Sequence, residues 1–354
     1  MNVVQRILHR RFFIKLFNWE YGSVGAVYTW LYPFWILLCI RSRSFFFFAA
    51  SNPTIENGGF LNETKKAITP LIPAQYHPKT VFFSLPANAE IVLKELNKHG
   101  LSFPLIGKPD IGGRGRGVKA LKDDTDVRSY VAGTVMDFHI QEYVAFKKEV
   151  GVFYYRMPGE ATGKVTGIVR KEFLSVTGDG THSIEELLLV DRRALMYIDG
   201  LRKMHGDFLK TILASGERVV VSPYGNHARG SMFLDDSHLI DDEFTQMIDE
   251  LCKRIPGFYF GRMDIRFDNW EDFKKGEKFM IIEVNGAGSE PTHIYDPRHS
   301  IFFAWKEILR HWLILYRVSK RNHQLGHPYL TFKQGVQMFR DDKIWSAKLA
   351  AMPE

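Results

Sequence analysis

Two neighbouring segments carry polar residues that could bind a metal ion. Residues 261–267 and 281–288 alternate apolar and polar side chains, which is the periodicity of β-strands, and the charged stretch between them predicts a hairpin. Opposed residues of an antiparallel pair have a constant sum of residue numbers, so if Asp264 faces Glu283, one face of the hairpin gathers a polar set. This set comprises Arg262, Asp264, Glu283 and Asn285.

Two carboxylates and an amide oxygen are suitable ligands for a hard cation. They favour Mg²⁺ that also binds phosphate oxygens, with Mn²⁺ as a substitute, and not zinc or a thiolate-bound metal. The same register places Arg262 opposite Asn285, where its guanidinium would stabilise charge developing on a phosphoryl or acyl oxygen. The alternative is a solvent-exposed hairpin with ordinary ion pairs, and other parts of the chain must decide.

A glycine-rich loop between two short strands could bind phosphate. The strand pattern of residues 103–108 ends in Lys108, and strand periodicity resumes at residues 118–121. Backbone N–H groups of glycine can approach an anion directly, and Lys108 would add a point charge. An RNA-binding Arg-Gly box is the alternative, but such boxes occur as disordered repeats, and we expect no nucleic-acid partner. The loop glycines are Gly112, Gly113, Gly115 and Gly117.

The strand pattern of residues 138–144 could hold an adenine base. Its edge can offer backbone donors and acceptors at Gln141, Glu142, Tyr143 and Val144. A few residues further on, the Glu149 carboxylate could accept hydrogen bonds from ribose hydroxyls. This pattern is weak alone, but its place between a phosphate loop and an acidic hairpin predicts a nucleotide site.

In this order the segments resemble the ATP-grasp ligases over residues 100–300. Residues 173–187 look most like the peptide-forming branch that includes cyanophycin synthetase, and the Glu283-x-Asn285 end is similar to D-alanine:D-alanine ligase. The resemblance implies an α+β ATP-grasp fold. It also implies a ligase that joins a carboxylate to an amine through an acyl phosphate, releasing ADP and phosphate.

By the same resemblance, individual residues receive roles. Lys108 contacts ATP phosphate, residues 142–144 line the adenine, and Glu149 holds the ribose. The Mg²⁺ ligands are Asp264, Glu283 and Asn285, beside Arg262, which steadies the transferring phosphoryl group.

Further polar residues are candidates for contacts with phosphate or substrate. Arg170 and Lys171 end the strand pattern that begins at Lys164, which would let them meet phosphate. His227 and Arg229 share a face if their segment is extended, and Arg229 would then suit a substrate carboxylate. Solvated side chains are the alternative for both pairs. The remaining substrate candidates are Gly286 and Gly288.

The resemblance starts late in the chain, so we expect an unusual domain organisation. The expected regions are 1–50, a basic and aromatic membrane-associating segment; 51–100, a reduced N-terminal α/β remnant; 101–325, the catalytic module; and 326–354, a C-terminal tail. The acceptor substrate is the least transferable part of the resemblance. A phosphotransferase, or a membrane-bound nucleotide-binding protein without ligase activity, are the rival interpretations.

The N-terminal region raises the question of a membrane. Twenty uncharged residues lie between Glu20 and Arg41, and four phenylalanines follow at positions 45–48. An in-plane anchor on an anionic membrane surface, an aromatic helix packed on the protein's own core, and a true span are all open. We expect a cytoplasmic protein that is peripheral at the inner face of the membrane, because ATP is available there.

Composition is compatible with these expectations. The chain has 354 residues, a net charge of +7 and 45% hydrophobic residues, which indicates a globular protein that tolerates anionic partners. Cys39 and Cys252 are its two cysteines, so neither a disulfide framework nor a cysteine metal site is supported.

Overall fold

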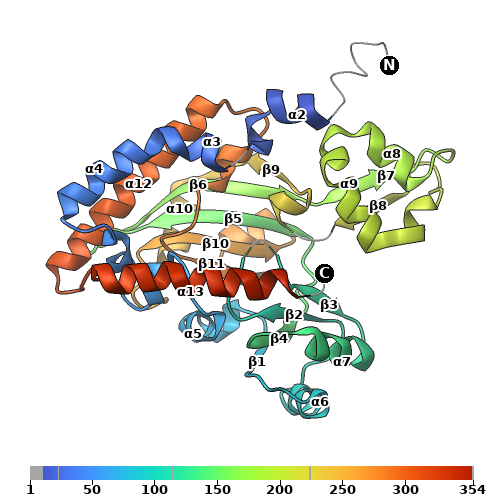
Figure 1. Ribbon diagram of the computed structural model, residues 1–354, viewed down its shortest axis with the longest axis horizontal. Helices are drawn as coiled ribbons and strands as arrows, with labels where there is room; N and C mark the ends of the chain where they lie inside the picture. Colours follow the sequence, from blue (N-terminus) through green and yellow to red (C-terminus); the bar gives the residue numbers. More distant parts are fainter. Residues whose placement is uncertain (1–10, 23, 114, 223–224, 353–354) are drawn as a thin grey trace.

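The centre of the molecule is a five-stranded antiparallel sheet (Figure 1). This computed structural model describes residues 11–22, 24–113, 115–222 and 225–352. The strand order is β11-β10-β5-β6-β9. The strands are β5 (Lys148–Tyr155), β6 (Lys164–Glu172), β9 (Met232–Asp235), β10 (Phe260–Phe267) and β11 (Phe279–Asn285). Helices α10 (Asp242–Lys253) and α11 (Trp270–Lys274) pack apolar residues on this sheet, including Phe244, Ile248 and Phe273.

A second antiparallel sheet carries the glycine-rich loop. Its order is β1-β4-β2-β3, with β1 (Thr80–Phe83), β2 (Leu105–Pro109), β3 (Lys119–Leu121) and β4 (Phe138–Glu142). Helices α6 (Ala89–Lys98) and α7 (Asp124–Gly133) cover it, and their buried residues share one core with the strands. The side chains of Asn88 and Asp123 cap the two helices by accepting backbone N–H groups.

A small lobe projects from the large sheet. It contains the two-stranded sheet of β7 (Leu174–Thr177) and β8 (Arg218–Ser222), with α8 (Ile184–Val190) and α9 (Arg192–His205). Ser183 and Glu186 form a capping box that starts α8. The lobe has its own apolar core, so it is a separate folding element of the catalytic region expected at 101–325.

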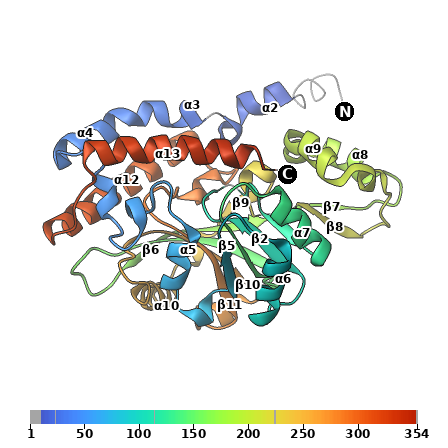
Figure 2. The same cartoon turned by 60° about the horizontal axis from the view of Figure 1, so that its bottom comes forward.

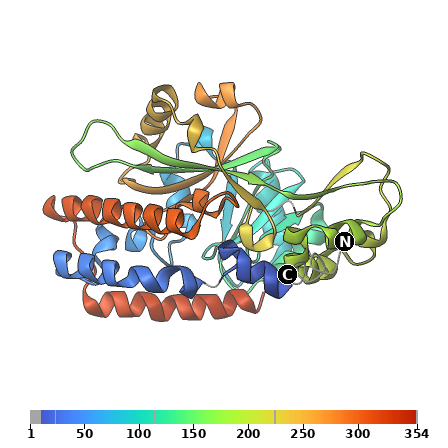
Figure 3. The same cartoon turned by 90° about the horizontal axis from the view of Figure 1, so that it is seen from above.

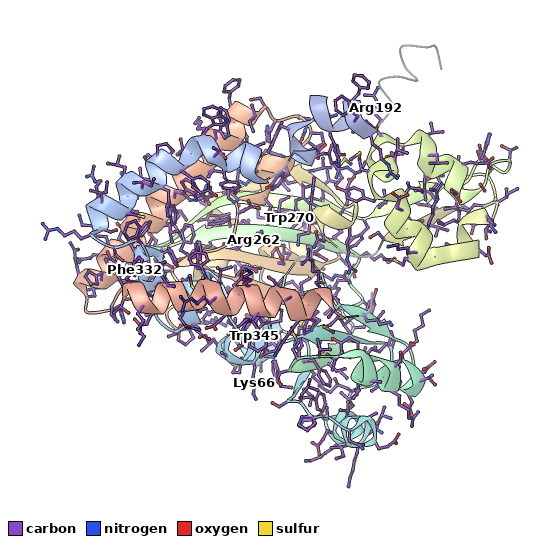
Figure 4. The ribbon with its side chains drawn as sticks, viewed as in Figure 1. Lys66, Arg192, Arg262, Trp270, Phe332 and Trp345 are labelled. Carbon is purple, nitrogen blue, oxygen red and sulfur yellow. The ribbon has the colours of Figure 1, made fainter. Side chains whose placement is uncertain are left out.

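Three long helices run side by side along the large sheet (Figures 2 and 3). They are α4 (Tyr32–Ser42), α12 (Ile301–Gln324) and α13 (Phe332–Ala350), joined by the shorter α2 (Arg11–Phe17), α3 (Val24–Tyr28) and α5 (Lys65–Ile68). Figure 4 labels Phe332 at the first turn of α13 and Trp345 near its last turn. The region expected as a C-terminal tail is therefore mostly one helix that packs on the rest of the protein.

The N-terminal segment packs on the protein with one face and is exposed on the other. Val27, Leu31 and Leu38 are buried in the core, and so are the phenylalanines at 46–48. Of the alternatives left open for this region, packing on the protein's own core therefore applies to the phenylalanines at 46–48, which contact α12 and α13. In the described part of the chain, no helix has the length and apolar character needed to cross a membrane.

The expected α+β class is confirmed by this mixture of helices and antiparallel sheets. The strands predicted from alternating side chains all form, with small differences at their ends. The predicted hairpin loop differs, because it contains the short helix α11, whose N-terminus is capped by Asn269.

Candidate functional site

A cavity of about 620 Å³ lies between the two large sheets. It is reached by side chains of β2, β4, β5, β6, β10 and β11, and by the glycine-rich loop. Most residues predicted from the sequence line it: Lys108, Gly112, Gly113, Gly115, Gln141, Glu142, Tyr143, Val144, Glu149, Lys171, His227, Arg262, Asp264 and Glu283. Segments far apart in the sequence therefore meet at one site.

The hairpin has the predicted register. Asp264 faces Glu283 and Arg262 faces Asn285, and the pairing shifts only after Asp264. Arg262 donates to both oxygens of Asp264, with Nε 2.9 Å from Oδ1 and Nη2 3.3 Å from Oδ2. Gly151 on the neighbouring strand leaves the room for this pair, because a Cβ there would lie about 3 Å from both side chains.

Lys171 joins two carboxylates at the base of the cavity. Its Nζ lies 2.9 Å from Glu149 Oε1 and 3.0 Å from Asp264 Oδ2, and all three side chains are buried. Burial opposes the ionised form of Asp264, but the charges of Arg262 and Lys171 outweigh it and lower the pKa of this carboxyl. Asp264 is therefore a charged, doubly paired carboxylate.

Two lysines lie beside Glu283. Burial lowers the pKa of Lys108 to about 8, while the charge of Glu283 acts in the opposite direction. Lys65 was missed by the sequence analysis. Its Nζ donates to the carbonyl oxygen of Gly112 at 2.8 Å and lies 3.8 Å from Glu283 Oε1, so it ties the glycine-rich loop to the hairpin.

In the cluster of interacting charges around Lys171 and Glu283, cations outnumber carboxylates. The carboxylates there are Glu149, Asp264 and Glu283, and the cations are Lys65, Lys108, Lys171, Arg262 and Arg266. Such an excess suits a polyanionic ligand. Arg266 also donates to Glu149 at 3.2 Å and to the carbonyl oxygen of Val144 at 3.1 Å.

The predicted adenine end has apolar walls. Gln141 and Glu142 end β4 and residues 143–144 follow it, and the cavity beside them is lined by Ile106, Val118, Ala120 and Ile282. These apolar residues were not predicted as site residues. For Ile106 the signal was available, because it is two residues from Lys108 on the same face of β2, whereas Ile282 is adjacent to Glu283 and lies where the β10–β11 pairing shifts. Apolar walls beside the end of a strand are a suitable place for a base.

Several predicted residues lie elsewhere. Arg170 follows the opposite face of β6 from Lys171, because successive side chains of a strand alternate, and it pairs with Asp236 and Glu172 outside the cavity. His227 and Arg229 are not extended but lie in a short 3₁₀ helix. His227 reaches the cavity, whereas Arg229 lies next to Gly115 of the glycine-rich loop.

Three predicted glycines have structural contacts. Gly286 and Gly288 pack closely on the backbone of residues 58–60, where the N–H of Gly288 donates to the carbonyl of Gly59 at 2.8 Å. This close approach explains why side chains are absent there, and the two glycines do not line the cavity. Gly117 has a φ of +67°, and its carbonyl accepts from Tyr130.

The donor set fits a magnesium ion that is shared with phosphate. In the described residues, no three acidic, histidine or cysteine side chains converge on one point, so protein carboxylates alone do not form a cage. Asp264 and Glu283 lie opposite each other, and the buried Nδ2 of Asn285 has no hydrogen-bond partner among the described residues. Nδ2 is a hydrogen-bond donor that cannot ligate a cation, and Asn285 is not among the residues that line the cavity, so the fit to Mg²⁺ rests on the two opposed carboxylates Asp264 and Glu283.

Comparisons with known proteins give a loose structural likeness. No family model matches the chain, and no curated protein matches its sequence. A D-alanine–D-alanine ligase from Bacillus anthracis shares 13% identity, with a TM-score of 0.39 over 72% of this chain and 68% of that chain. VanG D-Ala:D-Ser ligase from Enterococcus faecalis shares 17% identity, with a TM-score of 0.39 over 71% of this chain and 59% of that chain.

A bifunctional glutathione synthetase from Pasteurella multocida shares 15% identity, with a TM-score of 0.38 over 71% of this chain and 35% of that chain. The chain thus spans less than two thirds of two of these structures.

Proposed function

We propose that the protein is an ATP-dependent carboxylate–amine ligase that releases ADP and phosphate. The observation that carries this proposal is the Asp264–Glu283 pair inside a cavity rich in lysine and arginine. A polyanion and a divalent cation together satisfy both sets of charges. The order of the lysine loop, the strand edge and the acidic hairpin along the chain supports the same function.

The residues divide the work as follows. Lys108 and Lys65 hold phosphate oxygens, and residues 141–144 present the backbone to the adenine. A substrate carboxylate oxygen attacks the terminal phosphorus, and ADP leaves. An amine nitrogen then attacks the acyl carbon, and phosphate leaves with the electrons of the broken carbon–oxygen bond. Arg262 stabilises the charge on the transferring phosphoryl group.

The divalent cation would be held by Asp264, Glu283 and the Asn285 amide oxygen. Mg²⁺ is the expected ion, and Mn²⁺ can replace it because it uses the same oxygen donors. When bound, the ion neutralises phosphate charge. Arg262 and Lys171 would keep Asp264 ionised and oriented for such an ion.

The test is a screen of candidate carboxylate and amine pairs with the full chain, ATP and Mg²⁺. We expect ADP release that needs both substrates, together with an amide product. ADP release with a phosphorylated product and no amide would indicate a phosphotransferase. Nucleotide binding without ADP release for any pair would favour a binding protein without ligase activity.

We also infer that the outer face of α4 binds an anionic membrane surface. Ile40 on α4 is 68% exposed, and large exposed apolar residues also flank the helix, with Trp30 just before it at 73% and Phe45 just after it at 62%. Arg41 and Arg43 are exposed beside them. Cations next to exposed apolar residues suit anionic headgroups above an acyl boundary. ATP chemistry then places the protein at the cytoplasmic side.

A further inference from the structure

The cavity continues past Arg262 to an end that contains none of the residues proposed to bind the nucleotide. There its wall is formed by the N-terminal segment, through Trp19 and Val27, and by the stretch that follows β11. From that stretch come Glu290, Thr292 and Tyr295. Arg262 Nη1 donates to the carbonyl oxygen of Glu290 at 3.3 Å. This end of the cavity therefore adjoins Arg262, the residue proposed to stabilise the transferring phosphoryl group.

Glu290 has hydrogen-bond partners but no close ion-pair partner among the described residues. Its oxygens accept hydrogen bonds from the hydroxyls of Tyr28 and Tyr295, the latter 3.2 Å from Oε2. Among the described residues, no lysine, arginine or histidine nitrogen lies within 4.0 Å of it. Burial, together with the Glu290 charge, raises the pKa of Tyr28 well above its ordinary value, so this phenol stays protonated and donates.

The other carboxylate at this end is already neutralised. Glu20 lies 2.5 Å from Arg193 Nη2 and 3.0 Å from His227 Nε2. It therefore closes the wall of the cavity with an internal ion pair. The negative charge that remains available to a ligand is that of Glu290.

A second observation points to a ligand at the same place. The Thr292 side chain is 8% exposed, lines the cavity, and its Oγ1 has no hydrogen-bond partner among the described residues. A buried hydroxyl without a partner is costly, so a ligand that bonds to it is favoured. Around it the wall is apolar and aromatic, with the Trp19 and Tyr295 rings stacked at 5.5 Å and Val27 buried.

We propose that this end binds the amine substrate, with Glu290 as the anchor of its ammonium group. The substrate class is a primary amine that carries an apolar or aromatic group next to the nitrogen. The Glu290 charge favours an ammonium and repels the carboxylate substrate, which separates the two substrates within one cavity. An ammonium must lose a proton before its nitrogen can attack, and the Glu290 carboxylate can accept that proton. This inference rests on the proposed function.

The test measures binding, so that it does not depend on knowing the carboxylate substrate. The probes are phenethylamine and the neutral 2-phenylethanol, titrated into the full chain and followed by ligand-observed NMR. The variants are Glu290→Gln, which can still accept from the two tyrosines, and Thr292→Val, which keeps the side-chain shape. Glu277→Gln is the matched control, because Glu277 is an exposed carboxylate that does not line the cavity.

We expect phenethylamine to bind the wild type and Glu277→Gln equally, at least ten-fold more weakly to Glu290→Gln, and more weakly to Thr292→Val. The alcohol should bind all of them weakly. Equal amine binding to the wild type and Glu290→Gln, equal binding of amine and alcohol, or no amine binding to the wild type would overturn the inference. ATP affinity, measured in parallel, tests the proposed function separately, because Glu290→Gln should leave it unchanged.

Discussion

The Asp264 carboxylate forms ion pairs within the protein even without a ligand. Arg262 and Lys171 both contact its carboxylate, and Lys171 also contacts Glu149. Glu283 is different, because its side chain is 34% exposed and its nearest cation is 3.8 Å away. Of the two proposed carboxylate ligands, Asp264 therefore also stabilises the fold, whereas Glu283 contributes little to stability. Substitutions at the two positions can then distinguish a loss of catalysis from a loss of stability.

Glu283→Gln should abolish Mg²⁺-dependent ADP formation with little change in thermal stability, because it removes a charge but almost no volume. Asp264→Asn should abolish it too, but should also destabilise the protein by about 3–5 kcal/mol, since removing one partner leaves buried cations unpaired. ADP assays and thermal unfolding of both variants check this. Wild-type ADP release by Glu283→Gln would contradict the assignment.

Lys108→Ala should weaken ATP binding about ten-fold to hundred-fold, which is the effect of a charged phosphate contact worth about 1.5–3 kcal/mol. With a pKa of about 8, Lys108 is charged below that pH and neutral above it. The advantage of the wild type over Lys108→Ala should therefore be full below pH 8 and shrink above it. Calorimetry at several pH values measures this, and an advantage that is independent of pH would count against it.

For individual residues, the sequence predicts which side chains share a face of a strand, because the alternation of side chains controls this. Alternation of side chains was sufficient to place Arg262 opposite Asn285. The same rule, applied to Arg170 and Lys171, shows that both could not face one site, and only Lys171 does. Lys65 and Glu290 could not be predicted, because only tertiary contacts between distant segments bring them to the cavity.

Among the elements, α13 connects two distant parts of the molecule. At its start Phe332 packs on Phe46, and at its end Leu349 and Met352 lie against the glycine-rich loop. A Cβ on Gly112 would lie 2.8 Å from Leu349 Cδ1. The loop is thus packed on a helix end as well as open to the cavity. The local sequence of residues 326–354 does not indicate that this region contacts Phe46 and the glycine-rich loop. For this reason the sequence predicted only a tail.

Gly112→Ala should destabilise the protein by about 1–2 kcal/mol more than Gly113→Ala, the cost of placing a side chain at a positive φ. Gly112 has a φ of +144° and meets Leu349, whereas a Cβ on Gly113 has no atom within 4 Å. Gly112→Ala should also lose more ATP affinity, because the loop must shift. Thermal unfolding and calorimetry of the pair measure both effects; equal losses would refute the packing argument.

At the scale of the whole molecule, the N-terminal segment contributes buried side chains to the core and exposed side chains to the surface. Leu38 and the phenylalanines at 47 and 48 are almost fully buried, and burying such a side chain contributes about 1.5–3 kcal/mol. A simple anchor could be removed without loss of the fold, whereas we expect removal of this segment to expose the core residues of α12 and α13 that it covers. The sequence left these alternatives open, because an aromatic stretch suits a core and an interface equally well.

Membrane binding can be tested by co-sedimentation with vesicles. Binding should rise with anionic lipid and fall with salt, because each basic residue near the surface contributes about 1 kcal/mol and is screened. Ile40→Asp should weaken it, whereas Ile91→Asp should not, since Ile91 is similarly exposed, at 62%, but lies on α6. No binding to any vesicle, or equal effects of the two variants, would reject the α4 surface.

The cavity is one continuous space with the cations near Lys171 in one region and, at one end, the Glu290 carboxylate, whose described partners are tyrosine hydroxyls. A single molecule that joins a phosphate-like group to an ammonium group could therefore occupy both regions at once. Such a bisubstrate inhibitor loses its translational and rotational freedom once, where two separate ligands lose it twice, so its affinity can exceed that of either fragment by a large factor. The length of the linker that binds best would then measure the distance between the two sites in solution.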